Sequence, residues 1–600
     1  MISLLLLALA CTIVGCRAQR DVSIPAVQGR AHLSPLLGEQ VRLKGIVTAA
    51  GAGWIYVQGS PDSDETTSDG LIVRIAGTRF ARGDEVRLSG VVSELVPGGT
   101  NTANLSTTTL EAFDAEILAR NRPLPRSTVL GRDGRLPPHQ VISPDELPVN
   151  LRVQREVQQN RYDPSEDAID FFESLEGMLV TVRRPVAVSA TQTFSQDQSE
   201  VVTLPDAGAG MPAKRRTRRG GILLQPNQSE LGGPNPERIQ IQFDRTFLSG
   251  GVPLVRVGDT LGDVTGIMRY SFGNYEVAAI GRLAVTPGSH PPETGTLWAA
   301  PNALTVASYN VLNLSPTAPD SAQRRLLAMQ IVKSLGSPDI LALQEIQDDS
   351  GEEDDGTTSA RETLAALRTE IVSARGPRYA SFDIAPVDGR PGGVPGGNIR
   401  NAFLYNPERV RLVSYRSLGP AILAAAGARD SLAFEEARDP LEGVFEFRGR
   451  SLRVVNNHLT SRFGSTPVFG SVQPFVQAGE GERAAQVRAL HAYAAHVLAA
   501  DPGARLIVLG DMNTFEFSPE LAHVLPGSPP ALHQLLFRVS EDERYSFNYE
   551  GNSQTLDHVF VSKALQSRAE LDIVHLNVDF PALPGLTPSD HDPVVARFVP

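Results

Sequence analysis

Acidic, amide and imidazole side chains recur in the C-terminal half of this 600-residue sequence, each beside the end of a short apolar run. The set comprises Asn310, Glu345, His458, Asp511, Asn513, Asp557, Asp590 and His591. Polar groups at strand ends of one fold can converge on a single pocket. Carboxylates are the ligands that hard divalent cations prefer, and an imidazole can move a proton to or from a reacting oxygen. The set therefore predicts metal-assisted hydrolysis of a phosphoester.

The surrounding pattern predicts the elements that must position these groups. Apolar runs indicate strands at 305–310, 339–344, 402–405, 452–456, 505–509, 556–561 and 594–598, and helical spacing indicates helices at 322–335 and 482–498. Alternating strands and helices of this kind are typical of a layered α/β (α+β) sandwich. We therefore predict one catalytic domain over residues 300–600.

Six short motifs in this region resemble those of the endonuclease/exonuclease/phosphatase (deoxyribonuclease I-like) superfamily. They are Ser308-Tyr309-Asn310, Leu343-Gln344-Glu345, Asn457-His458-Leu459, Gly510-Asp511-Met512-Asn513, Leu556-Asp557-His558 and Ser589-Asp590-His591-Asp592-Pro593, in family order. The resemblance implies a four-layer αββα sandwich. It also implies a divalent cation, with Mg²⁺ expected and Mn²⁺ or Ca²⁺ as alternatives. Glu345 would be the principal metal ligand, with Asn310 beside it and Asp590 supporting the metal or the phosphate.

The same resemblance implies roles in catalysis. Asp511 would orient the attacking water, and Asn513 would hold that water or the phosphate. His591 would act as a base or stabilise the transition state, with Asp557 fixing its tautomer. His458 would assist the departure of the leaving oxygen.

One position departs from the family pattern. In deoxyribonuclease I a glutamate orients the histidine that matches His458, whereas Ile399 falls near that position here. His458 is therefore expected to lack this partner. Arg400, Arg462 and Arg483 are candidates for binding substrate phosphate, with the alternative that they pair with surface acids.

An acidic loop at 347–356 directly follows Glu345. It could bind Ca²⁺, although its spacing is not that of an EF-hand. The alternative is a solvated acidic loop.

Residues 21–126 are short strand patterns between Gly, Pro, Ser and Asp turns, which indicates a small β-barrel. The segment 38–47 recurs at 83–92, and each copy carries a glycine that permits a bulge. The region resembles the OB-like module found ahead of some large secreted bacterial nucleases. Trp54 and Tyr56 share one strand face and could stack nucleic-acid bases. The alternative is that this face packs the barrel.

Residues 127–295 are predicted to be a second, diverged OB-like region with inserted loops. Its expected strands are 177–182, 238–243 and 255–268. The densest basic run, 214–219, is expected to be a flexible loop that either grips phosphate or is merely solvated.

The N-terminus resembles a signal peptide. Residues 4–15 form an apolar run, too short to span a bilayer comfortably, that ends at Cys16 in a lipobox-like sequence. Residues 1–16 are therefore predicted to direct export, with a lipid anchor at Cys16 in the cell envelope. The alternative is a plain signal peptide and a secreted protein.

Composition limits the remaining possibilities. The two cysteines, Cys11 and Cys16, exclude a disulfide-rich scaffold and a cysteine-rich zinc protein. With 55 Lys+Arg against 68 Asp+Glu, the net charge is −13, which predicts a weak, salt-sensitive grip on nucleic acid. Four of the acids are assigned to the predicted metal site, so this charge does not exclude a nucleic-acid substrate.

Together these patterns predict an exported, metal-dependent nuclease that hydrolyses phosphodiester bonds of DNA, with RNA as a further candidate, and that acts as a monomer. One alternative is a sphingomyelinase-type phospholipase C or another phosphoesterase of the superfamily. A non-enzymatic alternative is a surface protein that binds nucleic acid. The sequence shows no exposed aromatic hairpin for a membrane, and its complete set of polar residues argues against a non-enzyme.

Overall fold

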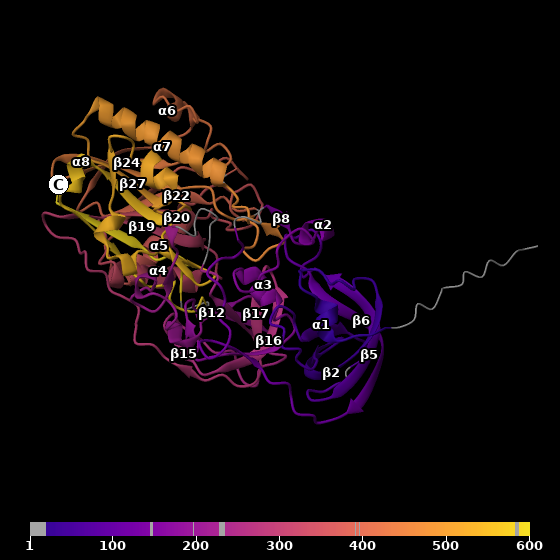
Figure 1. Cartoon of the computed structure of the whole chain (residues 1–600). Helices are drawn as coiled ribbons and strands as arrows, with labels where there is room; N and C mark the ends of the chain where they lie inside the picture. The colour runs from indigo at the N-terminus through magenta and orange to yellow at the C-terminus, as the bar shows by residue number, and fades with distance from the viewer. Residues whose placement is uncertain are drawn as a thin grey trace, which may run out of the picture.

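The computed structural model describes residues 20–599, except 78, 144–147, 196, 227–234, 391, 395 and 583–586. The predicted signal segment and Cys16 lie outside the described residues. Among the helices that are described, none has the length and apolar character needed to cross a membrane. Figure 1 shows an N-terminal barrel at one end, a large sandwich at the other, and the middle region between them.

The first sheet closes into a barrel. Its strands are β1 (Arg20–Asp21), β2 (Gln40–Gly51), β3 (Trp54–Gln58), β4 (Gly70–Arg74), β5 (Glu85–Leu95) and β6 (Thr107–Ala119). The order is β1-β2-β3-β4-β6-β5, and β5 returns to pair with β2. The two copies of the sequence repeat are therefore neighbours, with Leu43 opposite Leu88. The register shifts at Gly90, where an added Cβ would lie 2.6 Å from the carbonyl oxygen of Glu111.

The middle region contains a second sheet, whose central strands follow the same order as the strands of the first barrel. Its central strands are β9 (Leu179–Val182), β10 (Val186–Ala187), β12 (Gln198–Leu204), β14 (Ile239–Asp244), β16 (Val264–Ser271) and β17 (Asn274–Ala279). They run in the order β10-β12-β14-β17-β16-β9. The parallel pair β14–β17 occupies the place of the parallel pair β4–β6 in the first barrel.

The strand predicted at 255–268 in the middle region is wrong in its first half. Residues 255–259 are not a strand, and pairing begins only with the two-residue strand β15 (Thr260–Leu261). A turn causes this break, because Gly258 has a φ of +85° and Asp259 accepts a hydrogen bond from the backbone N–H of Arg256.

The aromatic face of the first barrel packs against the middle region. The rings of Trp54 and Phe247 are 5.4 Å apart, and Tyr56 is buried in a cluster with Leu179 and Ile267. The suggestion that Trp54 and Tyr56 stack nucleic-acid bases is therefore wrong. The alternative, that this face packs the barrel, is also incomplete. The face is buried in the contact between the first barrel and the middle region and not in the barrel interior.

The C-terminal region is a four-layer αββα sandwich, as predicted. One sheet has the order β21-β22-β20-β19-β33-β32 and the other β23-β24-β25-β27-β31-β28. The strands are β19 (Leu304–Leu314), β20 (Ile340–Ile346), β21 (Ala380–Asp383), β22 (Arg400–Tyr405), β23 (Arg411–Ser417), β24 (Leu441–Phe447), β25 (Arg450–His458), β27 (Leu506–Asp511), β28 (Leu532–Gln534), β31 (Asp557–Ser562), β32 (Ala569–Ile573) and β33 (Val594–Phe598).

Each sheet buries one face against the other sheet and one against helices. Phe403, Phe445 and Ile507 belong to the core between the two sheets. Helices α4 (Ser321–Met329) and α5 (Arg361–Ser373) cover the first sheet, and α6 (Pro420–Ala425) and α7 (Glu480–Ala500) cover the second. Figure 1 shows the two helix pairs on opposite sides of the sandwich. Strands buried on both faces have continuous apolar sequences, which explains why the sequence predicted them.

The basic run 214–219 docks onto the sandwich, so the expectation of a flexible loop is wrong. Arg219 Nε donates to Asp579 Oδ2 at 2.6 Å, and both side chains are buried. Arg218 forms exposed ion pairs with Asp542 and Glu543. Just beyond the run, β13 (Ile222–Leu223) pairs in parallel with β30 (Asn552–Gln554) of the sandwich. The middle region is thus attached by a buried charge pair and by added backbone pairing.

We predict that Arg219→Ala destabilises the protein by about 3–5 kcal/mol, because it removes the cation that contacts the buried Asp579 carboxylate directly. Arg218→Ala is the matched control, since its exposed pairs are worth at most about 1 kcal/mol. Urea unfolding of both variants measures the difference. Equal effects at the two positions would contradict the importance of the buried pair.

Candidate active site

The site forms where two strands of the first sheet bend. Pairing of β19 with β20 is interrupted between Asn310 and Leu314, and β20 shifts its register against β22 between Leu343 and Ile346. Glu345 has a φ of +60°, a left-handed conformation that is strained for a glutamate. Residues held in such conformations cluster at functional sites.

Asn310 connects the two sheets. Its Nδ2 donates to Glu345 Oε1 at 2.9 Å and to Asp511 Oδ2 at 3.1 Å. Glu345 lies on β20 of the first sheet, whereas Asp511 ends β27 of the second. One amide therefore holds carboxylates from both sheets at a fixed separation.

Glu345, His458 and Asp511 can form a cation site. One ligand atom from each lies within 4.8 Å of the others. His458 Nε2 is 3.9 Å from Glu345 Oε1 and 3.7 Å from Asp511 Oδ2. Carboxylate oxygens with one imidazole are a suitable donor set for a divalent cation. Among the described residues, no other group of His, Cys, Asp and Glu converges in this way.

The electrostatics of the site also favour a cation. Burial raises the pKa of Asp511 to about 7, and burial together with Asp590 raises the pKa of Glu345. Burial lowers the pKa of His458 well below its usual range, and Arg438 and His591 add to this effect. The buried Asp511 and the half-buried Glu345 beside a neutral imidazole are costly to ionise unless positive charge is supplied. The residues present therefore fit a bound divalent cation.

His591 and Asp557 form a hydrogen-bonded pair next to this cluster. His591 Nδ1 lies 2.7 Å from Asp557 Oδ2, which also accepts from Ser546 Oγ at 2.7 Å. Burial alone would lower the pKa of His591, but Asp557 and Asp511 outweigh it and raise that pKa well above its usual value. His591 Nε2 is 3.7 Å from Asp511 Oδ2. The second ring nitrogen thus faces the proposed cation site.

Two predicted residues lie beside this centre without joining the cation cluster. Asn513, with a φ of +48°, donates its backbone N–H to Asp511 Oδ1 and its Nδ2 to the carbonyl oxygen of Leu459. Asp590 is exposed, and its charge contributes to the raised pKa of Glu345. Asp590 therefore faces solvent near the site.

The three candidate arginines differ in position. Arg462 and Arg483 line a cavity of about 350 Å³ together with Thr514 and Phe515. The Arg462 guanidinium carbon lies 4.4 Å from the centre of the Phe515 ring. Burial, with Arg483 nearby, lowers the pKa of Arg462 to about 10. Arg483 donates to the carbonyl oxygens at positions 460 and 461.

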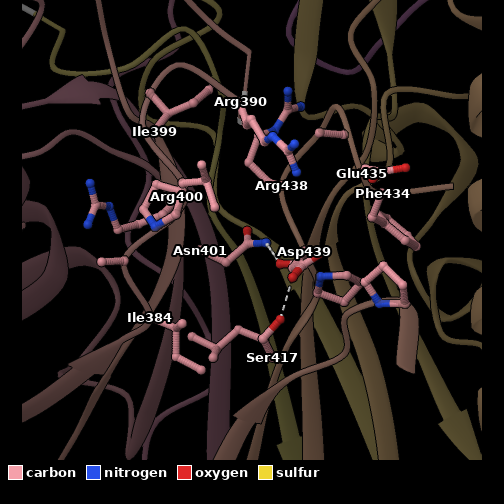
Figure 2. Close-up of a pocket in the computed structure, with 17 residues that line it drawn as sticks. Ile384, Arg390, Ile399, Arg400, Asn401, Ser417, Phe434, Glu435, Arg438 and Asp439 are labelled. Carbon is pink, nitrogen blue, oxygen red and sulfur yellow. Dashed lines mark hydrogen bonds between the residues drawn. The ribbon is translucent and has the colours of Figure 1, made fainter. Parts of the chain in front are cut away.

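Arg400 is not part of this cavity. It is buried and donates to backbone oxygens of Asn398 and Thr358, and it pairs with Asp383. Figure 2 shows its guanidinium turned away from Asn401 and Arg438. The structure thus gives Arg400 a structural position and does not bring it to the predicted phosphate.

Sequence reasoning missed Arg438. This buried residue donates from Nη2 to the carbonyl oxygen of Leu459 at 2.6 Å, and it interacts electrostatically with Glu345 and Asp511. No motif marks it, since it lies in a loop between α6 and β24. His458 Nδ1 has no hydrogen-bond partner among the described residues, and Ile399 is buried, which agrees with the departure seen in the sequence.

The acidic loop after Glu345 is an ordered turn. The carboxylate of Asp348 is buried and accepts from the backbone N–H groups of Ser350 and Gly351 and from Asn398 Nδ2. Glu352 and Glu353 are exposed. Of the two interpretations, the described contacts give Asp348 a turn-forming role, and the exposed acids remain solvated.

The centre lies between two sheets and combines buried carboxylates, amides and imidazoles, an arrangement suited to hydrolysis assisted by a metal ion. Residues 307–591 match the sequence profile of the Endonuclease/Exonuclease/phosphatase family. This region therefore belongs to that family, which confirms the resemblance seen in the motifs. Residues 129–287 match a profile described only as a domain of unknown function. No curated protein matches the chain.

Solved structures with a similar fold cover about half of the chain. One is TDP2 from Caenorhabditis elegans in truncated form, which is 18% identical with a TM-score of 0.33 over 49% of this chain and 97% of that one. Another is the human Nocturnin catalytic domain, which is 20% identical with a TM-score of 0.33 over 50% of this chain and 96% of that one. A third is a mannosyl-6-phosphatase from Bacteroides thetaiotaomicron, which is 17% identical with a TM-score of 0.32 over 49% of this chain and 99% of that one.

We predict that Mn²⁺ or Mg²⁺ stabilises the wild-type protein, by about 2.7 kcal/mol at a hundredfold excess over Kd. Glu345→Gln should lose most of this gain because it removes an anionic ligand. Glu353→Gln, an exposed acid of the following loop, is the control and should keep it. Thermal unfolding with and without metal measures the effect. A loss confined to Glu353→Gln would place the cation in the acidic loop.

Proposed function

We propose that this protein is an exported, metal-dependent nuclease that hydrolyses phosphodiester bonds of DNA or RNA. Mg²⁺ is the expected cation, with Mn²⁺ and Ca²⁺ as alternatives. The observation that carries the proposal is the convergence of Glu345, Asp511 and the His591–Asp557 pair around one point between the sheets. Such a centre can bind a phosphate, position a water and exchange a proton with the reacting oxygens.

A divalent cation held by Glu345, His458 and Asp511 would neutralise charge on the phosphoryl oxygens. His591 Nε2 is free of the Asp557 contact and can exchange a proton with the attacking water. Asp557 keeps the proton on Nδ1, which fixes the tautomer that this task requires. Asn513 donates its backbone N–H to Asp511 and so orients that carboxylate.

The surroundings of Asn513 support a polymeric substrate. Phe515 and Phe517 stack with ring centres 5.3 Å apart, and both line the cavity that contains Arg462 and Arg483. Phe517 is half-buried where it lines the cavity, whereas Phe515 is buried beside the Arg462 guanidinium. An aromatic ring beside arginines is a combination that can track a single nucleic-acid strand. We propose that the strand leaves the centre through this cavity, toward Pro226 of the middle region.

We propose that the N-terminal barrel and the middle region are OB-like modules, because their central strands follow one order with a parallel pair at the same place in each. We also propose export through the N-terminal segment, with a lipid anchor at Cys16 and a monomeric enzyme in the cell envelope.

The direct test is cleavage of plasmid DNA and of RNA with Mg²⁺, Mn²⁺ or Ca²⁺, with and without a chelator. His591→Ala should lower the rate by about 10²–10⁴-fold, because it removes the acid–base group. His496→Ala, an exposed histidine on α7, is the control. Cleavage that survives chelation, or equal rates for the two variants, would reject the mechanism. Hydrolysis of sphingomyelin without any nuclease activity would transfer the assignment to a phospholipase.

A second prediction concerns binding of the nucleic-acid strand by Arg462. Arg462→Ala should weaken DNA binding and reduce the slope of log K against log[salt] by about 0.7–0.9, the contribution of one phosphate contact. Arg488→Ala, which removes an exposed arginine of α7 paired with Asp430, is the control and should leave the slope unchanged. Binding titrations at several salt concentrations, with chelator present to prevent cleavage, measure both slopes. An unchanged slope in Arg462→Ala would remove this residue from the proposed path.

A further inference from the structure

A second cavity lies on another side of the proposed metal site. It has a volume of about 270 Å³, near the lower end for small-molecule sites. Its walls come from the loop after β21, the start of β22 and the segment between β23 and β24 (Figure 2). Ile384, Val387 and Phe434 supply apolar surface, and Asn401, Arg390 and Arg438 supply polar groups.

This cavity is joined to the centre through one residue. Arg438 lines the cavity, and its Nη2 donates to the carbonyl oxygen of Leu459, the residue that follows His458. Asn513 Nδ2 donates to the same carbonyl oxygen. Arg438 also interacts electrostatically with Glu345 and Asp511, so the cavity and the proposed metal site share a residue between them.

The cavity contains a buried acceptor without a donor. Asn401 is only 3% exposed, and its Nδ2 donates to the backbone oxygen of Asp439 at 3.0 Å. Its Oδ1 has no hydrogen-bond partner among the described residues. In Figure 2 this oxygen points to the side on which Arg390 and Arg438 lie. A buried unpaired carbonyl is costly, so a ligand with a donor group would gain affinity by pairing with it.

The walls restrict the class of ligand. Phe434 is buried at the back of the cavity, while Val387 is 63% exposed and Ile384 37% exposed at its mouth. Apolar surface on several sides suits a flat aromatic ring better than a sugar. Arg390 is exposed at the mouth, where its charge can attract a phosphodiester.

We infer that this cavity binds the nucleobase of the nucleotide adjoining the scissile phosphate, with Asn401 Oδ1 accepting a hydrogen bond from an amino group of the base. The inference rests on the proposed function, since it assigns the part of a nucleic-acid substrate next to the reacting bond. It makes Asn401 a residue that determines substrate preference. Bases with exocyclic amino groups, adenine and cytosine above all, should be preferred to thymine.

Equilibrium binding tests the cavity without turnover. Isothermal titration with Mg²⁺ compares 2′-deoxyadenosine 5′-monophosphate, thymidine 5′-monophosphate and 2-deoxyribose 5-phosphate. The adenine nucleotide should bind at least about fivefold more tightly than the sugar phosphate, from one satisfied buried hydrogen bond and the stacked ring. Equal binding of the nucleotide and the sugar phosphate would overturn the inference.

Variants locate the effect. Asn401→Ala should reduce the preference for adenine over thymine to less than about twofold. Val387→Asp changes an exposed residue at the mouth, so it does not threaten folding, and should weaken all nucleotides through charge repulsion. Asn101→Ala, in an exposed turn of the first barrel, is the control. Nucleotide affinities that are unchanged in both cavity variants would place the base elsewhere.

Cleavage separates this inference from the proposed function. A single-stranded oligonucleotide with one abasic residue, moved along its length, should be cut more slowly when that residue adjoins the cut, and Asn401→Ala should remove the difference. Cleavage that ignores the abasic residue would overturn the base cavity but leave the nuclease intact. Absence of all DNA and RNA cleavage beside base-dependent nucleotide binding would reject the nuclease and retain the cavity.

Discussion

The amide of Asn310 is the contact on which the rest of the centre depends. It donates to Glu345 and Asp511, which come from different sheets, and so fixes the distance between the two carboxylates. The bend in β19 that places this amide also places Asn313, whose backbone N–H donates to Glu345 Oε2. One irregular strand thus organises the catalytic edge of the sandwich.

The sandwich and its centre were predictable from the sequence because both produce local sequence patterns, which are apolar runs for the strands and short motifs for the site. Val594–Phe598 was predicted as a strand with the bounds it has, since it is short, apolar and buried on both faces. Glu345, Asp511 and His591 stand in short motifs beside such strands. Arg438 could not be found in this way. It stands in a loop, and only the packing of that loop brings it near Glu345.

Contacts between domains were the least predictable feature. Trp54 and Tyr56 have the spacing of a base-stacking face, and 214–219 has the charge of a phosphate grip. Both are covered by partners more than a hundred residues away in the chain, Phe247 for the first and Asp579 for the second. Aromatic and cationic side chains recognise proteins by the same physical means as nucleic acids. Their partner is decided by tertiary packing, which a local pattern does not contain.

The Arg219–Asp579 pair has a consequence for how such a chain can evolve. A sandwich without the neighbouring module could tolerate a solvent-exposed carboxylate at position 579. After a neighbouring module covers that acid and pairs it with Arg219, substitution of Arg219 alone leaves the carboxylate buried without its closest partner. Arg219 and Asp579 are therefore constrained to change together. The buried pair ties the sequence of the middle region to that of the sandwich.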